Sequence, residues 1–117
     1  MILVDTSVWV DHFQQGDPLL SKALLDGQVL MHPFLIGEIA CGNLRSRPKV
    51  LNDLQRLPLA IAADQHEVLN FLDQHRLFGL GINWIGAHLL ASARLSACRL
   101  WTLDTRLRAA AAKLHLN

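Results

Sequence analysis

Three acidic residues stand at places in the sequence where carboxylates could act together on a ligand. Asp5 follows the apolar run 2–4, Asp104 follows the run 99–103, and Glu38 lies in a predicted helix that follows another apolar run. Ligands of open parallel sheets bind beyond the carboxyl ends of the strands. We therefore expect these carboxylates to converge at that edge, although Asp5 or Asp104 taken alone could equally cap the helix that follows it.

Carboxylates that lie close together can exist in only a few chemical states. Two carboxylates about 4 Å apart repel by roughly 4 kcal/mol at an effective dielectric of 20. Such a group therefore takes up a proton or is held together by a divalent cation. Oxygen ligands without a nearby cysteine suit Mg²⁺ or Mn²⁺. An ion of this kind activates water and stabilises charge on a phosphate, so the pattern indicates phosphodiester hydrolysis.

The elements that must position these residues alternate along the chain. Short apolar runs predict strands at 2–4, 29–31, 59–61 and 99–103. Helices are predicted between and after them from apolar residues at helical spacing and from capping signals, which include Asp17-Pro18, Asp64-x-x-Glu67 and Asn83. Strands that alternate with helices indicate a parallel sheet with right-handed crossovers. We predict an α/β fold with three layers, a central parallel sheet flanked by helices, and a single domain spanning 1–117.

Composition excludes several classes of protein. The chain has 117 residues, of which 51% are hydrophobic and 18% charged, with a formal net charge of +1, so it is neither disordered nor a strongly basic nucleic-acid coat. No apolar run approaches the roughly 18 residues of a membrane span, and no signal peptide is apparent, so we expect a soluble cytoplasmic protein. Cys41 and Cys98 form no C-x-x-C pair, and we expect both to be reduced core residues, although their spacing alone leaves a disulfide between them open.

Four segments together resemble a known family. They are MILVDTSVWVDHF, HPFLIGEIACGNLR, GINWIGAHLLASA and RLWTLDTRL, and in this order they extend over essentially the whole chain. The sequence is similar to the VapC toxins of bacterial type II toxin–antitoxin modules, which are PIN-domain ribonucleases. The resemblance implies a PIN-like domain that cleaves RNA with Mg²⁺ or Mn²⁺.

The resemblance also assigns roles to residues. It implies that Asp5, Glu38 and Asp104 are catalytic, with Asp5 and Asp104 as metal ligands. Glu38 would complete the shell and help to orient or deprotonate the attacking water. Ser7 lies where a hydroxyl often assists the site, and Thr102 is the threonine of the family's T-x-D motif, so both are supporting residues.

One position departs from the family pattern. The motif W-[IV]-D-x-H-L-L-A-S-A places a further aspartate where this chain has Gly86. A glycine in the first turn of a helix costs about 1 kcal/mol relative to alanine, and the helix dipole favours a carboxylate there. We interpret Gly86 as a carboxylate lost from the cluster and expect metal binding and cleavage to be weakened or abolished. A milder alternative is that a water replaces the carboxylate and the other three acids keep partial function.

The resemblance implies particular partners. These are a VapB-type antitoxin, a second copy of the chain in a homodimer, promoter DNA reached only through the antitoxin, and a structured RNA such as tRNA or rRNA. Two alternatives remain: a catalytically dead protein that still binds antitoxin as a partner or co-repressor, and a structure-specific DNA nuclease. The latter is less favoured because the chain is short and lacks inserted clamp segments.

The histidines, tryptophans and basic residues indicate a function less specifically than the acidic residues do. The histidines at 32, 66, 75 and 88 match no metal-binding motif, and we expect them to be structural. The tryptophans at 9, 84 and 101 lie in apolar patterns, which favours packing in the core or at a subunit interface over stacking on bases. A basic set is either a phosphate-binding rim or a solvated surface: Arg45, Arg47, Lys49, Arg76 and Arg94.

Overall fold

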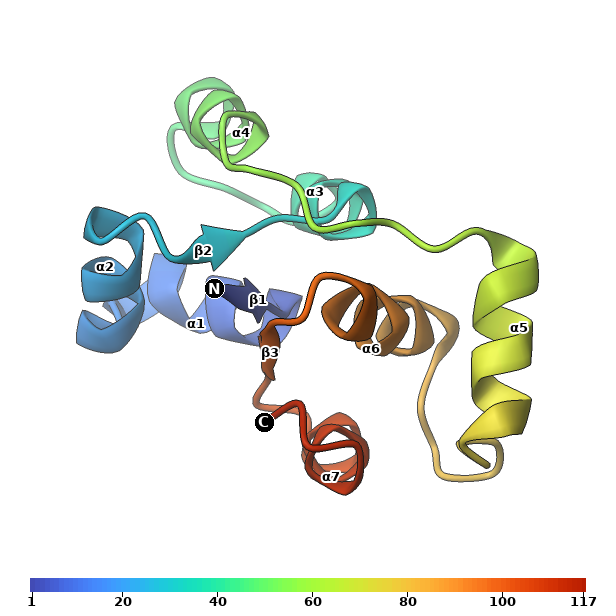
Figure 1. Cartoon of the computed structure of the whole chain (residues 1–117). Helices are drawn as coiled ribbons and strands as arrows, with labels where there is room; N and C mark the ends of the chain where they lie inside the picture. Colours follow the sequence, from blue (N-terminus) through green and yellow to red (C-terminus); the bar gives the residue numbers. More distant parts are fainter.

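Three parallel strands form the centre of the protein, seen in a computed structural model that describes residues 1–117 (Figure 1). They are β1 (Ile2–Val4), β2 (Val29–Leu30) and β3 (Arg99–Trp101), in the order β2-β1-β3. In register, Leu3 lies opposite Leu30 on one side and Leu100 on the other. Asp5 directly follows the central strand β1 and therefore lies between the carboxyl ends of β2 and β3.

Seven helices surround this sheet. They are α1 (Thr6–Gln15), α2 (Pro18–Leu25), α3 (Pro33–Ala40), α4 (Arg47–Gln55), α5 (Gln65–Gln74), α6 (Trp84–Leu95) and α7 (Thr105–Lys113). The helix α6 packs against β1 and β3 and is covered on its other side by α5, while α1 packs against α3. Figure 1 shows α2 and α5 at opposite ends of the molecule, with the sheet and α6 between them. The predicted α/β architecture with a central parallel sheet is confirmed.

Local capping signals position several helices as predicted. Asp17 accepts hydrogen bonds from the backbone N–H groups of Leu19 and Leu20 at the start of α2. Asp64 and Glu67 form a complete capping box at the start of α5. Each cap satisfies N–H groups that have no partner within the helix.

The prediction of a strand over 59–61 is wrong, apart from a single residue. Only Leu59 takes part, in an isolated parallel bridge with Met31. Pro58 has no N–H to donate, and the N–H of Ile61 donates instead to Ser96 Oγ at 2.8 Å. The backbone therefore leaves the sheet after one bridge. The last strand is also shorter than predicted, because β3 ends at Trp101.

The core lies on both faces of the sheet and along α6. Leu3, Leu89 and Leu90 are among its fully buried side chains. Cys98 is buried as predicted, and burial raises the pKa of its thiol. The prediction that Cys41 is also a core residue is wrong, because Cys41 is the C-cap of α3 and lies exposed. None of the helices is long and apolar enough to cross a membrane.

Candidate active site

Asp5 is held by two hydroxyl groups rather than by a basic residue. It is 9% exposed and stands at the N-cap position of α1, but its side chain makes no capping bond. Its Oδ2 accepts from Thr102 Oγ1 at 2.7 Å and from Ser7 Oγ at 2.9 Å. Because the carboxylate does not cap the helix, the capping interpretation of Asp5 does not hold. Its other oxygen, Oδ1, accepts no hydrogen bond within the protein.

The same two hydroxyls also fix the chain that leads to Asp104. Thr102 Oγ1 accepts from the backbone N–H of Asp104 at 3.0 Å, and Ser7 Oγ accepts from that of Leu103 at 3.0 Å. These bonds explain why β3 ends at Trp101: the N–H groups beyond it serve the site instead of the sheet. Thr102 therefore joins Asp5 directly to the backbone of Asp104.

Asp104 does cap the helix that follows it. Its Oδ1 accepts from the backbone N–H groups of Arg106 at 2.9 Å and Leu107 at 3.1 Å at the start of α7. Oδ2 accepts no hydrogen bond. The capping interpretation and the ligand interpretation are thus compatible for this residue, since one oxygen serves the helix and the other is free.

Glu38 is tied to the segment next to Asp5. Its Oε1 accepts from Thr6 Oγ1 at 2.8 Å, while Oε2 accepts no hydrogen bond. Thr6 is a residue of this site that the sequence analysis does not predict. Its partner lies 32 residues further along the chain, so the local sequence carries no signal for this contact.

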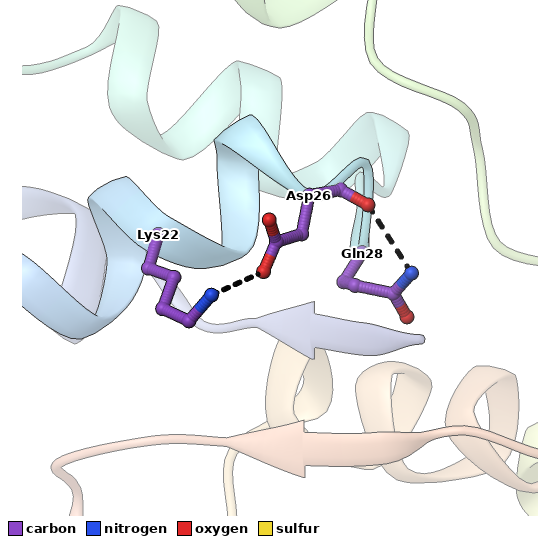
Figure 2. A network of polar contacts seen from close by, with 3 residues as sticks. All are labelled: Lys22, Asp26 and Gln28. Carbon is purple, nitrogen blue, oxygen red and sulfur yellow. Dashed lines mark hydrogen bonds and ion pairs between the residues drawn. The ribbon is translucent and has the colours of Figure 1, made fainter.

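None of the three carboxylates has a basic partner. The structure contains two ion pairs, Lys22–Asp26 in α2 and Lys49–Asp53 in α4, both exposed. Figure 2 shows the first, with the Gln28 side chain donating to the backbone oxygen of Asp26. The charge at the carboxyl edge of the sheet is therefore left without a cationic side chain to neutralise it.

The donor set suits an oxygen-preferring cation, although the carboxylates do not form a closed cage. No group of three or more acidic, histidine or cysteine side chains is arranged to hold a metal ion. Magnesium is commonly bound through one or two carboxylates and several waters, so the free oxygens of Asp5 and Asp104 fit such an ion.

Position 86 borders this site. The N–H of Gly86 donates to Asn83 Oδ1 at 2.7 Å, which confirms Asn83 as the cap of α6. A Cβ at Gly86 would lie 3.3 Å from Leu107 Cδ1, and the Leu107 N–H donates to Asp104. It would also lie 3.1 Å from Asn83 Oδ1 and from Ile82 Cγ2. A side chain here would thus start beside the first turn of α7, against neighbours that must yield slightly.

An aromatic cluster lies where α3 and α6 meet. The His88 ring contacts Phe34 and Trp84, with centroid distances of 4.6 Å in both cases. As predicted, His88 therefore turns away from the side of α6 that bears Gly86. Trp84 is 40% exposed and lies outside the core, whereas Trp9 is buried.

Two other surface features lie apart from the carboxylates. A pocket of about 600 Å³ is lined by residues of α2 and β3 among others and shares only Thr102 with the acidic site. Two members of the predicted basic rim have structural partners: the Arg47 guanidinium donates to the backbone oxygens of Ala40 and Gly42, and Lys49 pairs with Asp53.

The structure defines an α/β domain with a parallel sheet and with acidic residues after β1 and β3 and in α3. The sequence profile of the PIN domain matches residues 2–113, and the chain belongs to this family. It is 41% identical over 114 residues to Ribonuclease VapC32 of Mycobacterium tuberculosis, in both the CDC 1551 / Oshkosh and H37Rv strains. The match covers 97% of this chain and 92% of that relative. The resemblance to VapC-type PIN-domain proteins is thereby confirmed. No solved structure matches the chain.

Proposed function

We propose that this chain is the toxin component of a type II toxin–antitoxin module and has the site of a metal-dependent endoribonuclease. The observation that carries the proposal is the hydrogen bonding of its three acidic side chains. Asp5, Glu38 and Asp104 each have one oxygen held by hydrogen bonds and the other free, with no basic partner. Similarity to a relative named as a ribonuclease supports RNA as the substrate.

The contacts support the following roles. Asp5 and Asp104 hold Mg²⁺ or Mn²⁺ through their free oxygens, and Glu38 orients or deprotonates the attacking water. Ser7 and Thr102 keep Asp5 in place by donating to its other oxygen. When bound, the ion supplies an activated water and charge stabilisation at the phosphate. The substrate class is a structured RNA such as tRNA or rRNA, cut in an exposed single-stranded loop.

Gly86 makes this site deficient in the present chain. A Cβ at this position, where the family has an aspartate, would contact Leu107, whose backbone N–H donates to Asp104, and the glycine contributes no ligand. Two ligating carboxylates and Glu38 bind a cation more weakly than a set with a further carboxylate, so cleavage by this chain is weak or absent.

Cleavage of RNA in Mg²⁺ or Mn²⁺ by the wild type and three variants tests the proposal. Gly86→Asp adds the carboxylate, Gly86→Asn adds its neutral isostere, and Gly86→Ala adds only the Cβ that meets Asn83, Ile82 and Leu107. We expect Gly86→Asp to cleave at least about tenfold faster than the wild type, since metal stabilisation of the transition state is worth several kcal/mol, and the other two to gain nothing. Equal and robust cleavage by all four proteins would contradict the proposed role of position 86.

A second candidate function is that of a catalytically inactive partner of the antitoxin, or a co-repressor. It is favoured by the buried Gly86 and by the absence of a group of three metal-holding side chains. In both cases we propose a VapB-type antitoxin, a homodimer, contact with promoter DNA only through the antitoxin, and a cytoplasmic location. Capture of the antitoxin by a chain that neither binds Mn²⁺ nor cleaves RNA, even as Gly86→Asp, would favour the second function.

A further inference from the structure

Two exposed aromatic rings are fixed by a buried histidine between them. Phe34 is 39% exposed and Trp84 40%, whereas His88 is 4% exposed. The His88 ring meets each of them edge-on, with interplanar angles of 63° and 87°. These contacts hold the two rings in place, so that their free surface is preformed. We refer to Phe34, Trp84 and His88 as the aromatic patch.

The aromatic patch lies at the same edge of the sheet as the acidic residues. Phe34 is in the first turn of α3, directly after β2, and Glu38 follows it by four residues on the same side of that helix. Trp84 is the first residue of α6, and α6 leads into β3, so its N-terminus lies at the carboxyl edge of the parallel sheet. The patch is therefore about one helical turn from a proposed catalytic residue.

A free cation lies near the loop that leads into the patch. The Arg106 side chain covers Gly81, and a Cβ at that glycine would collide with it. Arg106 is exposed and has no acidic partner among the ion pairs of the structure. Gly81 precedes Trp84 by three residues. Exposed rings and an unpaired guanidinium next to the same loop supply contacts for the two parts of a nucleotide, a base and a phosphate.

We propose that the aromatic patch is a stacking site for a base of single-stranded RNA next to the phosphate that the acidic residues act on. The inference rests on the proposed function and adds a substrate subsite to it. Unpaired bases stack readily on aromatic side chains, and this contact tolerates many sequences. A second copy of the chain fits less well, because two rings at these exposures offer far less than the roughly 800 Å² that each partner buries in a stable interface.

Binding of a short unstructured RNA, measured in EDTA at low salt so that cleavage does not intervene, tests this subsite. Phe34→Leu and Trp84→Leu keep apolar volume but remove the stacking ring, and each should weaken affinity about tenfold. Phe34→Tyr and Trp84→Phe keep a ring and should restore affinity to near the wild-type value. Phe78→Leu is the matched control, because Phe78 is 64% exposed and makes no ring contact with the patch.

An abasic oligonucleotide of the same length separates base contacts from phosphate contacts. It carries the same charge but nothing to stack, so it should bind the wild type and both leucine variants equally. Only the base-containing RNA should quench the tryptophan emission of the wild type, and Trp84→Leu should lose this quenching. Sedimentation of the same variants shows whether the patch instead joins two copies of the chain.

Four outcomes decide the inference. Wild-type affinity for RNA in both leucine variants would overturn it, as would loss of a dimer with unchanged RNA affinity per chain. If Gly86→Asp cleaves RNA while the leucine variants bind it normally, only the stacking site is wrong. If no form of the protein binds or cleaves RNA, the proposed function itself fails.

Discussion

At the scale of single residues, the site is organised by hydroxyl groups. Asp5 is nearly buried and has no basic partner, and a charge in such a place is costly unless it is hydrogen-bonded. Thr102 is 3% exposed and donates to Asp5 while accepting from the Asp104 backbone. One hydroxyl thus sets the relative positions of two proposed ligands that are 99 residues apart in sequence.

Replacing Thr102 by valine should damage both stability and metal binding. Valine keeps the shape but removes the donor to Asp5, which costs about 1–3 kcal/mol of unfolding free energy in urea. Thr105→Val is the control, since Thr105 is exposed and its side chain makes no hydrogen bond, so its effect should stay within about 0.5 kcal/mol. Equal stability of the two variants would show that the hydroxyl at 102 does not support Asp5.

At the scale of elements, Asp104 combines two tasks at the start of α7. One oxygen caps the helix and the other is free for a cation. Asparagine caps helices about as well as aspartate, whereas alanine does not. The two tasks are therefore separable by substitution.

Asp104→Asn should keep the stability of the wild type and lose Mn²⁺ affinity, because the cap remains while the charge is gone. Asp104→Ala should lose Mn²⁺ affinity and about 1 kcal/mol of unfolding free energy as well. Urea denaturation and Mn²⁺ calorimetry on the same samples measure the two effects. Wild-type Mn²⁺ affinity in Asp104→Asn would exclude Asp104 as a ligand.

The sequence predicts elements best where their signals are local. The caps at Asp17, Asp64 and Asn83 involve only neighbouring residues, and all three form. The apolar run at 59–61 does not become a strand, because Ser96 takes the N–H that a sheet would have used. In the same way, the place of Asp5 and Asp104 after strands could be predicted, and the resemblance indicated Ser7 and Thr102 as supporting residues. The bond from Thr102 to Asp5, which lies 97 residues away in sequence, is visible only in the fold.

At the scale of the whole molecule, the fold buries two neutral histidines against one another. His32 Nδ1 accepts from the Phe34 N–H at 3.0 Å, so the ring hydrogen is on Nε2, which has no partner. His88 Nδ1 is likewise buried without a partner. Burial, and then the neighbouring His88, lower the pKa of His32 from 6.5 to about 4, and burial also lowers the pKa of His88. The prediction that these histidines are structural agrees with this environment.

Because of His32, the free energy of unfolding should decrease as the pH falls from 6.5 to about 4. The unfolded chain takes up a proton on His32 near pH 6.5, but the folded chain resists it until about pH 4, so the stabilisation is complete above the first value and is lost towards the second. The shift corresponds to about 3 kcal/mol. His32→Asn keeps an acceptor for the Phe34 N–H and cannot titrate, so its unfolding free energy should depend less on pH over this range. If the unfolding free energies of the wild type and His32→Asn changed equally with pH, the loss of stability in acid could not be assigned to His32.

At the same scale, the tertiary structure determines which residues surround position 86. Only the tertiary structure shows that a side chain there would begin next to Leu107, whose backbone N–H donates to the capping side chain of Asp104. The most direct measurement is a calorimetric titration of Mn²⁺ into the wild type and into Gly86→Asp, with Gly86→Asn alongside. We expect the aspartate variant to bind at least about tenfold more tightly than either other protein, because it adds a charged oxygen ligand. Indistinguishable affinities in all three would mean that the acidic edge is not a cation site lacking one member.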